Sequence, residues 1–153
     1  MPLFIGEYTG KLDDKGRLIF PSEFRMQAGA ANVQYVVQKD VLCAGSLAMY
    51  ALDEWTKRSE LARSRINLFT REGVKAWEEF NRDRVLVIPD EKMGRITIPK
   101  FLLEYIRVQK EVTFVGEDTI IRLWAKEAWK AGPEEDEKRR DEERANLIEK
   151  LLG

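Results

Sequence analysis

The 153-residue chain contains no histidine and one cysteine, Cys43. Histidine is the commonest general base and metal ligand, and paired cysteines form disulfides and zinc sites. Their absence removes the usual means of catalysis, metal binding and internal cross-linking. The sequence also has no glycine-rich phosphate loop and no serine-nucleophile motif. We therefore expect a protein that is not an enzyme, has no catalytic residues and needs no metal or other cofactor.

Long apolar runs are absent too. No window approaches the roughly 20 apolar residues that a membrane-spanning helix requires, and the first residues carry no export signal, so we expect a cytoplasmic protein without a membrane partner. Hydrophobic residues make up 44% and charged residues 35% of the chain. This composition favours a packed core with a well-solvated exterior. The formal net charge of −1 excludes nucleic-acid binding by bulk charge alone.

One nine-residue stretch occurs twice. Residues 13–21 are DDKGRLIFP, and residues 91–99, which lie 78 positions later, are EKMGRITIP. In both copies an acidic residue stands four positions before an arginine, a lysine lies between them, and a glycine precedes the arginine. An apolar triplet and a proline follow. Internal repetition of this kind indicates two tandem copies of one supersecondary unit.

Each copy predicts a strand, a tight polar turn, a second strand that forms a hairpin with the first, and a short helix. Gly16 and Gly94 suit a turn that needs positive φ, and Pro21 and Pro99 suit the first turn of a helix. A second pair of strands follows each helix. These pairs are expected at residues 33–37 with 47–50 and at residues 112–115 with 119–124, with about four extra residues in the first copy near 43–46.

The segments outside the repeats are predicted to be helical. Residues 51–65 and 68–80 indicate two helices between the copies, and we expect the aromatic residues of the second, Phe69, Trp77 and Phe80, to pack rather than to bind a ligand. Gly132 and Pro133 interrupt the chain before a highly charged helix at 134–150.

The predicted fold is mainly β with packed helices, an α+β class. It divides into a first unit with its closing helix (1–65), a connecting helix (66–81), a second unit (82–131) and a charged C-terminal helix (132–153).

Basic residues lie at both hairpin tips. They are Lys15, Arg17, Lys92 and Arg95. One interpretation is that the tips enter a DNA groove as a β-ribbon, where arginine hydrogen-bonds guanine or phosphate. The other is that ion pairs from Asp13 to Arg17 and from Glu91 to Arg95 hold the two turns. The two interpretations are compatible, because an acid can orient an arginine that reaches outward.

These residues resemble a known family. The doubled motif is accompanied by Phe-x-Gly-Glu at 4–7, Phe-Arg at 24–25, Leu-Asp-Glu-Trp at 52–55 and Ala-Lys-Glu-Ala-Trp at 125–129. Together they are similar to MraZ, a family of bacterial transcriptional regulators in the AbrB-like swapped-hairpin superfamily. The resemblance covers approximately residues 1–129.

The resemblance implies two tandem AbrB-like units that interleave in one pseudo-twofold β-barrel, and chains that assemble into a closed homo-oligomeric ring. Its partner would be promoter DNA with short direct repeats, upstream of the division and cell-wall gene cluster that the family represses. The protein would then be nucleoid-associated. The implied DNA contacts are Arg17 and Lys15, followed by Arg95 and Lys92, and the implied orienting acids are Asp13 and Glu91.

The chain departs from the family pattern in three places. Ile5 stands where many members have a basic residue, the second motif begins with Glu91 instead of aspartate, and Lys92 lies one place earlier than Lys15 relative to its arginine. Two other functions stay open at this stage. One is an AbrB-like antitoxin that neutralises a toxin through its tail, and the other is an oligomeric scaffold that does not bind DNA.

Overall fold

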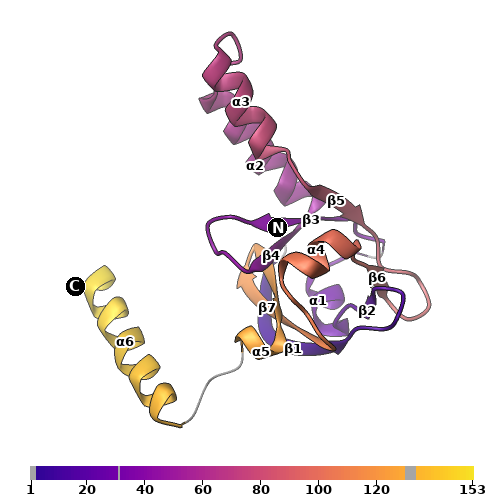
Figure 1. Cartoon of the computed structure of the whole chain (residues 1–153), viewed down its shortest axis with the longest axis vertical. Helices are drawn as coiled ribbons and strands as arrows, with labels where there is room; N and C mark the ends of the chain where they lie inside the picture. The colour runs from indigo at the N-terminus through magenta and orange to yellow at the C-terminus, as the bar shows by residue number, and fades with distance from the viewer. Residues whose placement is uncertain (1–2, 31, 130–133) are drawn as a thin grey trace.

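The computed structural model describes residues 3–30, 32–129 and 134–153, and Figure 1 shows the arrangement of its elements. In chain order these are β1 (Phe4–Lys11), β2 (Arg17–Ile19), α1 (Ser22–Gln27), β3 (Tyr35–Asp40), β4 (Ser46–Ala51), α2 (Leu52–Arg65), α3 (Arg71–Phe80), β5 (Arg84–Val87), β6 (Arg95–Thr97), α4 (Lys100–Tyr105), β7 (Glu111–Asp118), β8 (Ile120–Ala125), α5 (Lys126–Trp129) and α6 (Glu134–Leu152). The predicted α+β class is confirmed.

The strands form a six-stranded antiparallel sheet in the order β1-β7-β8-β4-β3-β5 and a two-stranded ribbon of β2 and β6. The predicted pairs β3–β4 and β7–β8 are confirmed. The hairpin predicted within each motif is wrong, because β1 pairs with β7 and β2 pairs with β6, both from the other copy. Each motif therefore forms a turn between two strands, and the backbone N–H and C=O groups of both strands hydrogen-bond to strands of the other repeat.

The register of the strand pairs relates the two repeats by a pseudo-twofold axis. In the ribbon, Leu18 lies opposite Ile96, which is 78 residues further along the chain. In the sheet, Ala48 lies opposite Arg122, at an offset of 74 residues. The difference of four matches the extra residues predicted in the first copy. β1 and β5 are the edges of the sheet, and the described strands show no pairing between them, so the pairing alone closes no barrel.

The core lies between the ribbon and the sheet. Leu18 and Ile96 point inward from the ribbon and are each 1% exposed. They join a cluster of buried aromatic and aliphatic side chains contributed by both copies. The short helices α1 and α4 follow Pro21 and Pro99 as predicted, and each buries one residue, Phe24 or Leu102, in this cluster. The two repeats thus share the main hydrophobic core.

Helices α2 and α3 form an antiparallel arm that projects from the sheet (Figure 1). Its base is packed, since Trp55 stacks on Phe80 with ring centroids 5.3 Å apart and both belong to a second apolar cluster on the sheet. Trp77 also stacks on Phe80, at 5.6 Å. Phe69, at the tip of the arm, is 100% exposed. The packing predicted for Phe69 is therefore wrong, because the arm ends beyond the reach of the core.

We expect Phe69→Ser to change the free energy of unfolding by no more than about 0.5 kcal/mol, since an exposed side chain without contacts contributes little. Urea denaturation of the full-length protein followed by circular dichroism measures this. Phe80→Ala is the matched control, and its loss of stacking on Trp55 should cost several times as much. A loss of 2 kcal/mol or more in the Phe69 variant would show that the arm tip packs within the chain.

Helix α6 is confirmed, and its described side chains, from residue 137 onward, are all exposed. Figure 1 shows it apart from the sheet. The break predicted at Gly132 and Pro133 lies outside the described residues. Among the ranges that the structure describes, the helices all fall short of the length and apolar content of a membrane span.

Candidate nucleic-acid interface

The outer face of the β2–β6 ribbon carries both motif arginines. Arg17 lies opposite Thr97, and Ile19 lies opposite Arg95. All four side chains point away from the core, because their neighbours Leu18 and Ile96 occupy the buried face. The pseudo-twofold axis passes between the two arginines, which places them on one face at diagonal positions.

Each turn is anchored to the strand of the other copy. The Phe20 N–H donates to the Gly94 carbonyl at 2.8 Å, and the Ile98 N–H donates to the Gly16 carbonyl at 3.0 Å. Gly16 and Gly94 have φ of 77° and 71°, a backbone conformation that other residues adopt at a cost. The ribbon and the two turns therefore form one hydrogen-bonded unit in which both tips are fixed relative to each other.

In the first turn the Asp13 carboxylate holds both the backbone and the arginine. Its Oδ1 accepts from the backbone N–H groups of Lys15 (2.9 Å) and Arg17 (2.8 Å), and its Oδ2 accepts from the Arg17 Nε–H at 2.7 Å. The backbone N–H of Arg17, aided by its guanidinium, lowers the pKa of Asp13. The ion pair predicted between Asp13 and Arg17 is confirmed.

In the second turn the acid is Asp90, and the ion pair predicted from Glu91 is wrong. Asp90 Oδ1 accepts from the backbone N–H groups of Met93 (2.8 Å) and Gly94 (3.0 Å), while Oδ2 accepts from the Arg95 Nε–H at 2.9 Å. The Asp90 N–H donates to the Arg95 carbonyl, so the turn is one residue longer than the first. Glu91 lies on the exposed outer part of this turn.

Both arginines keep hydrogen-bonding capacity toward solvent. Only the Nε of each is used by its aspartate, and the terminal nitrogens of Arg17 and Arg95 donate to no residue of the described chain. Their side chains are 34% and 36% exposed. Lys15 and Lys92 are exposed beside them. The ribbon thus presents two oriented guanidinium groups with two ammonium groups at its ends, an arrangement suited to phosphate or base edges.

The carboxyl group of Asp90 should titrate with a midpoint near 2. Hydrogen bonds from the Met93 N–H and from Arg95 lower its pKa from the ordinary 3.8 to about 2. Because the folded pKa is the lower one, ionised Asp90 stabilises the turn above pH 3.8, and this contribution is lost as the pH falls toward 2. Carbonyl-detected NMR measures the midpoint. Arg95→Ala should raise it, and a wild-type midpoint at or above 3.8 would contradict the geometry.

Asp90 is the site residue that sequence reasoning missed. The gapless alignment of the two motifs placed Glu91 opposite Asp13, whereas the structure adds one residue to the second turn. The available signal was the pair Pro89-Asp90, which begins two residues after the end of β5, since aspartate commonly caps a turn with its side chain. The described residues contain no group of three or more acidic or cysteine side chains arranged to hold a metal ion.

Comparison with known proteins matches both repeats to the same protein family. The family model described as "MraZ protein, putative antitoxin-like" matches residues 3–72 and 85–150, so that each match contains one copy of the motif. The chain belongs to the MraZ family. The resemblance stated from the motifs is confirmed.

Curated relatives of the MraZ family cover most of the chain. The transcriptional regulator MraZ of Dictyoglomus thermophilum is 34% identical over 129 residues, which is 83% of this chain and 82% of the relative. The proteins of the same name from Moorella thermoacetica and Clostridium acetobutylicum are 35% and 34% identical, and each covers 83% of this chain and 84% of the relative.

Proposed function

We propose that this MraZ-family protein is a sequence-specific DNA-binding transcriptional regulator, a repressor of the division and cell-wall gene cluster. The observation that carries the proposal is the outer face of the ribbon, where Arg17 and Arg95 are oriented by aspartates and keep their terminal nitrogens for a ligand. The name of its relatives, transcriptional regulator MraZ, supports the same function. The protein would act in the cytoplasm at the nucleoid.

The ribbon is suited to lie against a DNA groove. A two-stranded ribbon fits the major groove, where arginine donates two hydrogen bonds to guanine or binds phosphate as a planar fork. We assign this contact to Arg17 and Arg95, and phosphate contacts to Lys15 and Lys92. Asp13 orients the first arginine. Asp90, rather than Glu91, has this role in the second turn, and fixing the guanidinium beforehand reduces the entropy lost on binding.

Assembly explains how a chain with net charge −1 can bind DNA. Four basic side chains make too few phosphate contacts for high affinity at physiological salt. A homo-oligomeric ring that displays several ribbons toward short direct repeats gains affinity through effective concentration. We infer that the interleaved AbrB-like units close into the barrel of each protomer, and that Ile5, which is 65% exposed, adds no phosphate contact.

The test of this function uses the full chain and the repeat-bearing promoter upstream of the division and cell-wall genes. Fluorescence anisotropy compares that DNA with a scrambled sequence of the same composition, and size-exclusion light scattering gives the mass of the assembly. We expect a closed oligomer that prefers the repeats by at least about a hundredfold. An intact oligomer that binds both DNAs equally, or neither, would contradict the proposal and favour a scaffold that does not bind DNA.

A further inference from the structure

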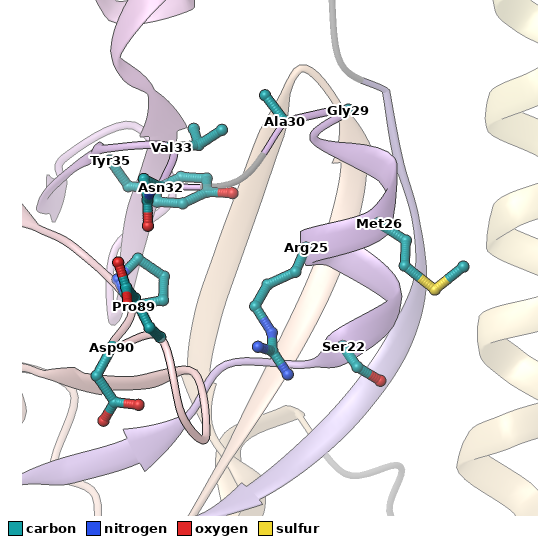
Figure 2. A pocket seen from close by; sticks show the side chains of 11 residues that line it. Ser22, Arg25, Met26, Gly29, Ala30, Asn32, Val33, Tyr35, Pro89 and Asp90 are labelled. Atoms are coloured by element: carbon teal, nitrogen blue, oxygen red, sulfur yellow. The ribbon is translucent and has the colours of Figure 1, made fainter.

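A cavity of about 720 Å³ opens beside the second turn, between helix α1 and the segment that leads from β5 into the turn. Figure 2 shows Arg25 of α1 on one side of this space and Tyr35, Val33 and Pro89 on the other. The wall is thus apolar on one side and cationic on the other. The two arginines of the ribbon, Arg17 and Arg95, do not line this cavity.

Arg25 has an unusual environment. Its guanidinium lies against the second turn, so that a methyl group added at Gly94 would come within 2.5 Å of the Arg25 Cζ. The Arg25 Nε is buried and has no hydrogen-bond partner among the described residues. The described chain also places no carboxylate within ion-pair distance of Arg25. Arg25 as a whole is half-buried, so only its Nε is shielded, and a guanidinium that no carboxylate pairs is suited to bind an anion.

The pseudo-symmetric position lacks this feature. At the offset of 78 residues, Arg25 corresponds to Leu103, and Gly94 corresponds to Gly16. A methyl group at Gly16 would meet the Ile98 carbonyl oxygen at 3.1 Å and the Leu103 Cδ1 at 3.5 Å, and the second of these is an ordinary apolar contact. The two halves therefore support their turns differently: the first turn lies on a leucine, and the second lies on a guanidinium that borders a cavity.

The other polar groups of the cavity limit the class of ligand. Tyr35 is 1% exposed, and its hydroxyl donates to no described residue. Burial raises the pKa of Tyr35 to about 12, so the hydroxyl remains a donor at neutral pH. The Asp90 carboxylate is already engaged by the Arg95 side chain and the turn backbone, whereas the exposed Glu91 adds negative charge at the rim. That charge disfavours polyanions and favours a ligand with one negative group.

We propose that this cavity binds a small carboxylate with an apolar body, whose anionic group pairs with Arg25 and whose body lies against Val33 and Pro89. Because Arg25 touches Gly94, binding changes the support of the second turn, which carries Asp90 and Arg95. The site is then an effector site that acts on one of the two turns. Binding of the ligand is independent of the proposed DNA function, and only the effect on DNA affinity depends on it.

The test is isothermal titration of the full-length protein, without DNA, with acetate, phenylacetate and indole-3-acetate. Phenylacetamide is the uncharged counterpart of phenylacetate. We expect saturable binding of the two aromatic carboxylates, and binding of phenylacetamide that is about ten- to a hundredfold weaker, since a hydrogen bond to a charged group contributes that factor. Arg25→Gln should reduce the affinity for phenylacetate to the same extent, and Arg63→Gln, on helix α2, should leave it unchanged.

A second variant keeps the test decisive if Arg25→Gln fails to fold, as judged by circular dichroism. Ala30→Trp fills the cavity from its exposed rim and leaves Arg25 in place, and it should abolish binding. The proposal is overturned if no carboxylate of the series binds the folded wild type. It is also overturned if phenylacetamide binds as tightly as phenylacetate, or if Ala30→Trp binds phenylacetate normally.

Discussion

Replacing Arg17 by alanine is expected to weaken binding to repeat-bearing promoter DNA by about 1–3 kcal/mol for each engaged protomer, which is about 5- to 150-fold. The substitution removes a guanidinium that Asp13 holds at 2.7 Å and that presents its terminal nitrogens outward. The fold should survive, because the Arg17 side chain is 34% exposed and the buried face of the ribbon belongs to Leu18 and Ile96.

Fluorescence anisotropy at fixed salt measures the affinity, and size-exclusion light scattering verifies the assembly. Arg63→Ala is the matched control, since it removes the same charge from an exposed position on helix α2, away from the ribbon. Binding by Arg17→Ala that equals that of the control would exclude the ribbon as the contact surface. An Arg17→Ala chain that no longer assembles would favour the scaffold function, in which the ion-paired turns face other subunits.

Replacing Phe20 by alanine is expected to lower the free energy of unfolding by about 3–5 kcal/mol, the usual cost of removing a buried aromatic ring. Phe20 is 0% exposed and lies directly after β2. Its ring centroid is 5.0 Å from that of Tyr35 and 6.0 Å from those of Phe24 and Phe114, so it joins both repeats. Loss of the ring would therefore leave a cavity at the point where the ribbon meets the sheet.

Urea denaturation followed by tryptophan fluorescence measures this loss. Met26→Ala is the control, since Met26 is 79% exposed on the neighbouring helix and should change stability by less than about 0.5 kcal/mol. Because a small domain has only about 5–15 kcal/mol of stability, the Phe20 variant should unfold at a clearly lower urea concentration. A loss below about 1 kcal/mol would show that the repeats do not share one core at this residue.

The sequence predicts the positions of the strands and helices better than it predicts which strands pair. The apolar triplets before Pro21 and Pro99 indicate strands that end at short helices, and the structure confirms both. Alternation of apolar residues does not specify which strand pairs with which. A β1–β2 hairpin and exchange between copies both bury Leu18 and Ile96, and the exchanged pairing depends on contacts between residues 76–114 positions apart.

The sequence likewise predicts some residues of the candidate site and misplaces others. The motif predicts the arginines, the glycines and the acidic turn. It misplaces the second acid, because a turn of one additional residue preserves the spacing of glycine, arginine and proline while moving the carboxylate to Asp90. The cavity beside Arg25 had no sequence signal, since its wall combines α1 with the segment before the second turn, and only the folded chain brings these together.

The measurement that tests the central claim most directly is the affinity of the wild type and of the double variant Arg17→Ala, Arg95→Ala for the promoter repeats over a range of salt concentrations. Each phosphate contact adds about 0.9 to the slope of log affinity against log salt. We predict a steep slope for the wild type, a clearly smaller one for the double variant, and the same oligomeric mass for both. Equal slopes and equal affinities in the two proteins would contradict a DNA contact through the ribbon.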